Sequence, residues 1–476
     1  MHGAATGKGV AEAPLRKRKK LRKPQTVLRR WPLLCKNGNM ENNDAQQTKT
    51  SHCEKACGIS RQCGACQHVN MPYERQLQRK QEFVIGLFED VAGDDCMLEP
   101  ILGMDAPFRF RNKIVSPFAP GKRMPAAKGQ RQGKRASGER SSKGRKGSGS
   151  AKREILCGMY AQGTHRIVPV PECPVEHPCG RRIVRTVSQL MRKFDIAPYD
   201  EDAGVGFMRH VVVRVGHESG EVLVTLVTNA SQFPGARNFA RELAKRCPEI
   251  TTVVQNVNTR STNAILGTEE HVLYGPGFIL DTLCGLSFRI SSHSFYQVNA
   301  VQTEVLYRAA LKWALDGIDL EDIGHPLSIM DAYCGTGTIG LVAASMAGDA
   351  RVIGVDKVAS AIRDARQNAA HNGIENATFI AADAGDYLRL RASAGERFDV
   401  LIMDPPRAGS SEEFLRAAAE SGVDRIVYIS CNPHTQVRDV RYLQQFGYKL
   451  CRIQPVDMFP HTDHVECVVL MLRKNT

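Results

Sequence analysis

The stretch Leu327-Ser-Ile-Met-Asp-Ala-Tyr-Cys-Gly-Thr-Gly-Thr338 decides the fold of the C-terminal half of this chain. Its first four residues form a β run, and an Ala- and Leu-rich helical segment follows at 339–347. Gly335 and Gly337 lie between the two, where glycine lets the backbone turn tightly and approach a ligand closely. A strand, a glycine turn and a helix in this order predict the first unit of a parallel sheet with a ligand site at the turn.

The same alternation of β runs and helical segments continues downstream and predicts an α/β fold for residues 296–476. The further β runs are Arg351–Val355, Ala377–Ile380, Val400–Met403 and Ile426–Ile429. Helices are expected on both faces of such a sheet, and its ligands bind beyond the carboxyl ends of the strands. The polar or reactive residues that follow the five runs are Asp331, Asp356, Asp383, Asp404 and Cys431. We therefore predict the active site at these strand ends.

The acidic residues near the glycine turn favour a cofactor that contains adenosine. Asp356 stands 19 residues after Gly337, a spacing at which a carboxylate can accept hydrogen bonds from both ribose hydroxyls. Asp383 could reach the adenine amine, and the motif Asp404-Pro-Pro-Arg407 ends the fourth run. These neighbours favour S-adenosylmethionine. Because Gly340 stands where dinucleotide-binding turns have a third glycine, spacing alone leaves a dinucleotide open.

A cysteine and a glutamate complete the predicted site. Cys431, in Ser430-Cys-Asn-Pro433, follows the last β run of the series, where nearby donors are expected to lower its pKa and expose the reactive thiolate. Glu466, in His461-Thr-Asp-His-Val-Glu466, leads into the β run Cys467–Leu472 and can act as a general base. By residue type alone, a buried cysteine and a solvent-exposed edge-strand glutamate would be the better interpretations. Their joint position favours a nucleophile and its base.

These parts suit methylation of carbon 5 of uracil. That carbon is too weakly nucleophilic to attack a sulfonium methyl group directly. Addition of a thiolate to carbon 6 makes carbon 5 carbanion-like, and after methyl transfer a base removes the carbon-5 proton so that the cysteine is released. Covalent catalysis thus divides one hard step into easier ones.

The sequence lacks the apolar segments of a secreted or membrane protein, and its basic residues are concentrated in two tracts. No apolar run approaches the ~20 residues of a membrane span, and no apolar stretch follows the basic N-terminus. We expect a cytoplasmic protein. The net charge of +14 is concentrated in residues 1–36 (+10) and 122–153 (+11), which leaves −7 for the remainder. Both tracts have the composition of disorder, and they either attract phosphates or act as solubilising segments.

Four parts are expected along the chain. Val211–Val215 and Val222–Val227 read as a hairpin within a region rich in β signals. A helical segment near Tyr73–Glu89 precedes that region. The expected parts are a basic disordered leader at 1–50, a cysteine segment with a helix at 51–96, a β-rich RNA-binding domain at 97–295 with a disordered basic insertion at 121–153, and the catalytic domain at 296–476.

Together these motifs resemble the bacterial RNA uracil-5-methyltransferases, particularly the branch with an iron–sulfur cluster that acts on large-subunit (23S) ribosomal RNA. The matching motifs are Ser292-His-Ser-Phe-Tyr-Gln-Val-Asn299, Asp331-Ala-Tyr-Cys-Gly-Thr-Gly337, Asp404-Pro-Pro-Arg407, Ser430-Cys-Asn-Pro433, His461-Thr-Asp-His-Val-Glu466 and, earlier, Phe110-Arg-Asn-Lys113. The resemblance implies a Rossmann-like methyltransferase domain with Cys431 as nucleophile and Glu466 as base. It also implies an S-adenosylmethionine site formed by Gln297, Tyr333, Asp356 and Asp404, with Asp383 as a further candidate.

The resemblance extends to the cysteines. Cys57-x5-Cys63-x2-Cys66 has the spacing of that branch, and Cys173 fits its distant fourth ligand. Four thiolates suit a [4Fe–4S] cluster, and spacing alone would suit structural zinc as well. The resemblance implies the cluster, in a structural or RNA-positioning role. Because the transfer-RNA branch in bacteria generally lacks these cysteines, ribosomal RNA is the expected substrate and transfer RNA the alternative. No membrane and no obligate protein partner is implied.

Overall fold

The computed structural model describes residues 57–123, 153–318 and 324–474, all within one compact unit that spans residues 53–476. The expected leader at 1–50 and nearly all of the expected insertion at 121–153 lie outside the described residues. Strands β2 (Lys113–Arg123) and β3 (Arg153–Tyr160), which flank that insertion, are antiparallel neighbours. The insertion therefore joins two paired strands.

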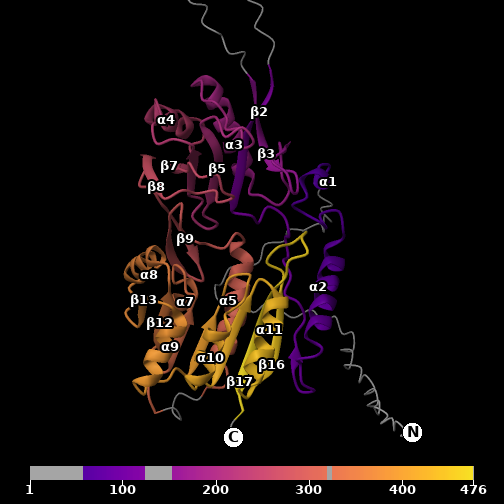
Figure 1. Cartoon of the computed structure of the whole chain (residues 1–476), viewed down its shortest axis with the longest axis vertical. Helices are drawn as coiled ribbons and strands as arrows, with labels where there is room; N and C mark the ends of the chain where they lie inside the picture. The colour runs from indigo at the N-terminus through magenta and orange to yellow at the C-terminus, as the bar shows by residue number, and fades with distance from the viewer. Residues whose placement is uncertain (1–56, 124–152, 319–323, 475–476) are drawn as a thin grey trace, which may run out of the picture. The chain divides into compact units, whose positions relative to one another are not determined.

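An eight-stranded sheet forms the C-terminal half (Figure 1). In hydrogen-bonded order its strands are β1 (Met97–Leu98), β16 (Tyr448–Val456), β17 (Glu466–Arg473), β15 (Arg425–Ser430), β14 (Val400–Met403), β11 (Ser328–Ala332), β12 (Arg351–Asp356) and β13 (Ala377–Ala381). The five strands from β15 to β13 are parallel, and β17 is antiparallel to both of its neighbours. All five strands predicted from the β runs are confirmed.

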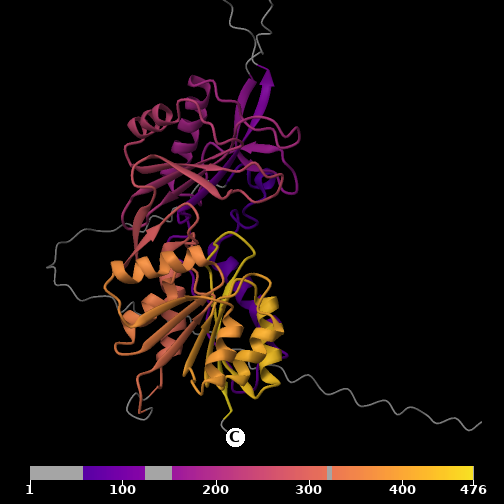
Figure 2. The same ribbon diagram turned by 60° about the vertical axis from the view of Figure 1, so that its left-hand side comes forward.

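Helices cover both faces of this sheet because successive side chains of each strand point to opposite sides. Along β14, for example, Val400 and Ile402 pack in one hydrophobic cluster, and Leu401 and Met403 pack in the other. The first cluster includes α5 (Ala300–Leu315), α7 (Thr338–Met346) and α8 (Ala359–His371). The second includes α2 (Tyr73–Phe88), α9 (Ala384–Ser393), α10 (Glu412–Glu420) and α11 (Pro433–Gln444). Figure 2 shows the orange and yellow strands between these helices.

A seven-stranded sheet forms the β-rich region. Its strands, in order, are β4 (Ile167–Pro169), β3, β2, β5 (Met208–Val215), β6 (Val222–Thr228), β7 (Ile250–Val257) and β8 (Glu269–Tyr274). The hairpin predicted for β5 and β6 is confirmed, and β6 pairs with β7 in parallel. Helices α3 (Pro178–Lys193) and α4 (Ala236–Arg246) complete its hydrophobic core. The short helix α1 (Ser60–Cys63) lies in the cysteine segment.

Two elements from before residue 296 pack with the C-terminal sheet. Strand β1 extends its edge by pairing in parallel with β16. The hairpin of β9 (Ile279–Leu283) and β10 (Leu286–Ile290) contributes Phe288 to the cluster around α5 and α8. The domain boundaries at 96/97 and 295/296 remain predictions, and these contacts cross the second of them. Within the described ranges, no helix combines the length and hydrophobicity required to cross a bilayer.

The glycine turn that follows β11 is tightly packed at Gly337. This residue has a φ of +79°, and a Cβ there would lie 2.7 Å from the ring of Phe379 and 3.0 Å from the Cβ of Ala365. Both neighbours are buried in the hydrophobic core. We expect Gly337→Ala to lower the free energy of unfolding by about 2–4 kcal/mol, through steric overlap and the left-handed backbone.

Urea unfolding measures this loss, and Gly348→Ala is the matched control. Gly348 has a φ of +58° but no heavy atom within 4 Å of a Cβ position. Its substitution should cost only about 1–2 kcal/mol, from the left-handed backbone alone. Equal losses in the two variants would contradict a packing role for Gly337.

Candidate active site

A cavity of about 1350 Å³ lies at the carboxyl ends of the central parallel strands. It is lined by the residues that follow β11, β12, β14 and β15, as expected for ligand sites in such sheets. Six of the seven predicted active-site residues line it, namely Gln297, Tyr333, Asp356, Asp404, Cys431 and Glu466. Folding thus gathers residues from six separate positions between residues 297 and 466.

The turn after β11 has a left-handed backbone and lines the cavity. Tyr333, Gly335 and Gly337 have φ values of 62°, 54° and 79°, so three left-handed residues bend the chain sharply. The N–H of Gly335 donates to Asp356 Oδ2 at 3.0 Å, and the N–H of Val358 donates to Asp356 Oδ1 at 2.8 Å. No heavy atom lies within 4 Å of a Cβ position on Gly335, so this part of the turn is free to approach a ligand.

Gln297 is positioned by the motif Phe110-Arg-Asn-Lys113. Asn112 is buried, its side-chain amide donates to the carbonyl of Gln297 at 3.1 Å, and its backbone N–H donates to Val298 at 2.9 Å. The motif therefore ties the β-rich region to the segment between β10 and α5. Sequence reasoning recognised this motif without assigning it that role.

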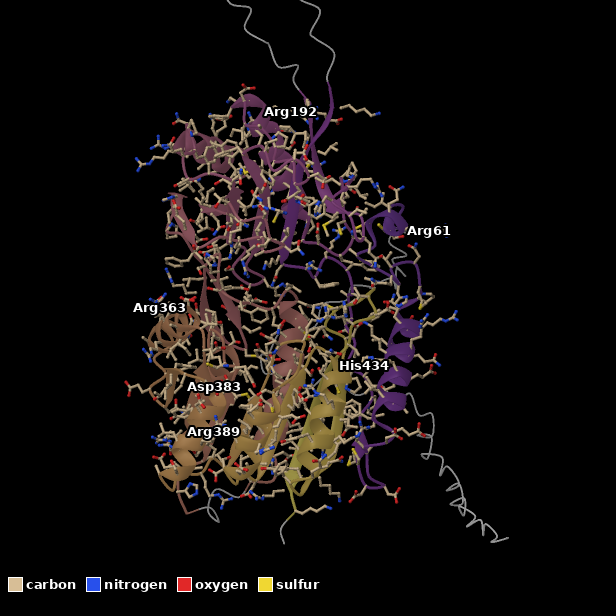
Figure 3. All side chains as sticks on the ribbon, in the orientation of Figure 1. Arg61, Arg192, Arg363, Asp383, Arg389 and His434 are labelled. Carbon is tan, nitrogen blue, oxygen red and sulfur yellow. The ribbon has the colours of Figure 1, made fainter. Side chains whose placement is uncertain are left out.

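Asp383 stands apart from the other predicted residues. It is the N-cap of α9, where it accepts from the N–H of Asp386 at 2.9 Å, and it forms an ion pair with Lys357 at 2.7 Å. The hydrogen bond from Lys357 lowers the pKa of Asp383. Figure 3 labels Asp383 at the start of α9. The next residue, Ala384, lines the cavity, whereas Asp383 is outside the lining.

The register of two antiparallel strands brings Cys431 and Glu466 together. Ser430 at the end of β15 lies opposite Cys467 of β17. Because the strands run in opposite directions, the next residue on β15 and the preceding one on β17 also face each other, and these are Cys431 and Glu466. Since β17 has a neighbour on each side, Glu466 is buried, with only 4% of its surface exposed. It is not the exposed edge-strand residue that its type alone suggested.

Burial and mutual repulsion raise the pKa values of the acidic groups in the cavity. Burial, reinforced by Asp404, raises the pKa of Glu466 to about 8, and burial raises that of Asp404 to about 7. Burial, with the charges of Glu466 and Asp404, raises the pKa of the Cys431 thiol to about 11. The expectation that nearby donors lower the pKa of Cys431 is wrong, because burial and the charges of two carboxyl groups outweigh the charge of Arg407.

Arg407 is the cation that opposes this trend. Its charge favours the ionised forms of both Cys431 and Glu466. Its guanidinium donates to Nδ1 of His464 at 3.0 Å, and its carbonyl accepts from the side-chain amide of Asn432 at 2.9 Å. Burial and the charge of Arg407 lower the pKa of His464, so that histidine accepts in its neutral form. The arginine at the end of Asp404-Pro-Pro-Arg407 was the available signal, but sequence reasoning gave it no role.

The four cysteines Cys57, Cys63, Cys66 and Cys173 line a second, small cavity of about 90 Å³. Burial and the charges of the other three thiols raise the pKa of Cys66 to about 12. The described cysteines form no disulfide, and no three His, Cys, Asp or Glu side chains of the described residues have the geometry to hold a metal ion. Arg111 and Phe459 line both this cavity and the active-site cavity, so the two adjoin.

Fold and cavity together define an S-adenosylmethionine-dependent methyltransferase of the α/β class. The model of the tRNA (uracil-5-)-methyltransferase family matches residues 219–474, more than half of the chain. An RNA methyltransferase of Halalkalibacterium halodurans is 37% identical over 424 residues, which cover 89% of this chain and 84% of that protein. One from Oceanobacillus iheyensis is 38% identical over 431 residues, covering 90% and 85%. The chain therefore belongs to the RNA uracil-5-methyltransferase family.

A solved structure is similar across most of the chain. The tRNA (uracil-54, C5)-methyltransferase of Pyrococcus abyssi, in complex with S-adenosyl-L-homocysteine, is 25% identical with a TM-score of 0.63 and covers 84% of each chain. S-adenosyl-L-homocysteine is what remains of S-adenosylmethionine after methyl transfer. Its presence in that relative supports S-adenosylmethionine as the methyl donor here, and the dinucleotide that glycine spacing left open is not needed.

Proposed function

We propose that this chain methylates carbon 5 of a uridine in 23S ribosomal RNA, with Cys431 as the nucleophile and Glu466 as the general base. The observation that carries the proposal is the position of Cys431 opposite Glu466 in the cavity that also contains Tyr333 and Asp356. One wall of the cavity thus offers groups for an adenosine cofactor, and the other offers a thiol and a carboxyl group for the base.

The reaction divides between these two groups. S-adenosylmethionine supplies an electrophilic methyl group. The Cys431 thiolate forms a bond to carbon 6. The electron pair of the double bond between carbons 5 and 6 is displaced to form an enolate, which makes carbon 5 nucleophilic. Once carbon 5 carries the methyl group, the Glu466 carboxylate accepts the carbon-5 proton, the bond between sulfur and carbon 6 breaks, and the thiolate is restored. Asp404, with a pKa of about 7, can donate a hydrogen bond to the uracil edge when protonated.

The raised pKa values predict how activity depends on pH. Both Glu466, with a pKa of about 8, and Cys431, with a pKa of about 11, must lose a proton before they act. Because Cys431 acts before methyl transfer and Glu466 acts after it, kcat/KM should follow the ionisation of the thiol, and kcat should follow both groups. Initial rates at subsaturating and at saturating RNA measure the two constants, and both should rise between about pH 6.5 and 9.5. A kcat/KM that is flat or falls would contradict the role given to Cys431, and such a kcat would contradict the role given to Glu466.

The cysteine cavity supports ribosomal RNA as the substrate, since its four cysteines match the branch that acts on that RNA. Transfer RNA is the second candidate. It is favoured by the similarity to the Pyrococcus abyssi enzyme, whose substrate is uridine 54 of transfer RNA. The motifs around Cys431 and Glu466 serve either substrate equally well.

Mapping of 5-methyluridine in ribosomal and transfer RNA from cells that lack this protein decides between the two. We expect one or more ribosomal positions to lose the methyl group, and the purified protein to restore it in vitro. Loss from transfer RNA with unchanged ribosomal RNA would replace the first substrate by the second. Unchanged 5-methyluridine in both would refute the proposed function.

We propose that the four cysteines of the small cavity bind a [4Fe–4S] cluster, on the chemistry of the four thiols and although they are not arranged around a metal position in this structure. Cys57, Cys63, Cys66 and Cys173 line one space, and the thiols lie close enough for three of them to raise the pKa of Cys66. Four thiolates are the ligand set of such a cluster. Here they would hold it to join the cysteine segment to the loops that carry Arg111 and Phe459, a structural role without redox chemistry.

Removing one of these thiols should remove the iron. Protein purified without oxygen is expected to contain iron and inorganic sulfide, and Cys66→Ala should lose most of both because a cubane needs its four ligands. Cys157→Ala is the matched control, since Cys157 is also half-buried but lies outside the cavity. Zinc in place of iron in the wild-type protein would exclude the cluster.

A further inference from the structure

A third cavity lies next to Cys431 and has no part in the chemistry described above. It measures about 460 Å³ and lies between α2, α11 and the segment 463–465. Cys431 and Arg407 line both this cavity and the active-site cavity. This third cavity, called the flanking pocket below, therefore opens onto the reactive sulfur from the side of α2 and α11.

Two aromatic rings form one wall of the flanking pocket. Phe83 of α2 and His434 of α11 pack edge to face, with ring centroids 5.4 Å apart and an interplanar angle of 67°. Phe83 is 40% exposed, which is unusual for so large an apolar side chain. Figure 3 shows His434 at the end of α11 nearest to α2. An exposed aromatic pair beside a reactive group is suited to stacking on a planar ring.

The charges of the flanking pocket favour an anion. Arg79 lies four residues before Phe83, so the two side chains occupy the same face of α2. Arg79 forms no ion pair with any residue in the described ranges, and the guanidinium of Arg407 donates to the neutral His464. The other charged lining groups are compensated, because Lys80 pairs with the buried Asp457 at 2.6 Å and His68 pairs with Asp463 at 2.5 Å. Two cations, Arg79 and Arg407, remain for a ligand.

We propose that the flanking pocket binds the RNA nucleotide adjacent to the target uridine, with its base stacked on Phe83 beside His434 and its phosphate beside Arg79. This inference rests on the proposed function and specifies how the substrate is held. A base that reacts at Cys431 must leave the RNA stack, and its neighbour, one phosphodiester away, loses a stacking partner. The aromatic pair replaces that partner beside the same sulfur.

The flanking pocket therefore positions the substrate without reading its sequence. Stacking on an aromatic side chain tolerates every base because each base has a π face. The pocket should increase affinity for an RNA strand with an extruded uridine, while Cys431 and Glu466 determine the chemistry.

The test uses the RNA fragment identified by 5-methyluridine mapping, with 5-fluorouridine at the target position. Such a base cannot lose a proton from carbon 5, so a covalent adduct with Cys431 accumulates and its rate can be followed against RNA concentration. Phe83→Ala should raise the half-saturating RNA concentration roughly 5- to 150-fold, the range expected for loss of one stacked base. The maximal rate and the half-saturating S-adenosylmethionine concentration should be unchanged.

Matched variants separate stacking from loss of structure. Phe83→Tyr keeps the aromatic face and should restore tight RNA saturation. Leu390→Ala on α9 removes another exposed large apolar side chain, which lies outside both cavities, and should behave as the wild type. An abasic nucleotide beside the target should weaken binding to the wild type but add no further loss to Phe83→Ala, because both changes remove the same contact.

Arg79→Gln gives an independent readout. Loss of one phosphate contact should reduce the slope of log affinity against log salt concentration by about 0.7. If the losses of RNA affinity from Phe83→Ala and from the abasic RNA are additive, the proposed role of the flanking pocket is wrong. An RNA saturation curve that Phe83→Ala leaves unchanged would also overturn it. Absence of any adduct in the wild-type protein would instead refute the proposed function, so the two failures are distinguishable.

Discussion

Cys431→Ala is expected to abolish both methylation and the covalent adduct with 5-fluorouridine RNA. Turnover should fall by at least about four orders of magnitude, because removal of a covalent nucleophile eliminates the reaction route. Burial raises the pKa of this thiol to about 11, so only a small fraction is ionised at neutral pH, and the attack on carbon 6 depends on that fraction. Denaturing gels that separate free RNA from adduct, together with transfer of labelled methyl groups, measure both losses.

Cys451→Ala is the control for Cys431→Ala. Cys451 is a half-buried cysteine of β16 outside the active-site cavity, and its substitution should leave the adduct and turnover unchanged. A Cys431→Ala protein that folds normally and still methylates uridine would eliminate the covalent mechanism. An adduct that persists in that variant would assign the nucleophile to another cysteine.

Glu466→Gln is expected to stop the reaction after methyl transfer. Glutamine keeps the size of the side chain but cannot accept the carbon-5 proton, so turnover should fall by about 10²- to 10⁴-fold. Because elimination needs that proton to leave, a methylated covalent adduct should accumulate on RNA with ordinary uridine, where the wild type releases its product. Mass spectrometry of the trapped peptide should find both the nucleotide and the added methyl group.

The double variant Cys431→Ala/Glu466→Gln provides the control, since it lacks the sulfur that forms the adduct. If Glu466→Gln turns over at nearly the wild-type rate, another group must be the base. In that case Asp404, the other carboxyl group that raises the pKa of Cys431, would be the first to test.

The stability of Glu466→Gln provides a second readout of the buried carboxyl group. The pKa of Glu466 is about 8 in the folded protein against an ordinary value of 4.5, so the folded state holds the proton more tightly than the unfolded state. Its contribution to stability is present below about pH 4.5 and is lost as pH rises through 8. The glutamine variant loses nothing, and its melting temperature should exceed that of the wild type increasingly toward pH 9. Melting temperatures that change equally with pH in the two proteins would contradict burial of this group.

Much of the fold follows from local sequence. The β runs between Leu327 and Ile429 alternate with helical segments, and that periodicity determines a parallel sheet covered on both faces. The turn with Gly335 and Gly337 follows equally directly, since its left-handed backbone favours glycine. Because ligand sites of such sheets lie at the strand ends, the position of the active site could be predicted as well.

Other properties depend on which distant segments meet. Asp383 follows a β run just as Asp356 does, yet it caps α9 and pairs with Lys357 instead of lining the cavity. A strand-end position identifies a candidate, but the direction of the side chain depends on the helix that begins there. The flanking pocket could not be foreseen either, because Phe83 and His434 are 351 residues apart in sequence and meet only through packing of α2 against α11.

Local sequence is enough to predict the order of strands and helices and the glycine turn, and to propose Cys431 and Glu466 as the reactive pair, because these depend on neighbouring residues and on short motifs. Tertiary structure decided the environment of that pair. The register of β15 against β17 places Glu466 opposite Cys431, and β16 on the other side of β17 buries it. The pKa of each group depends on burial and on charges from distant segments. Residue type and local sequence therefore suggested an exposed glutamate and a lowered thiol pKa, whereas the structure has a buried carboxyl group and a raised thiol pKa.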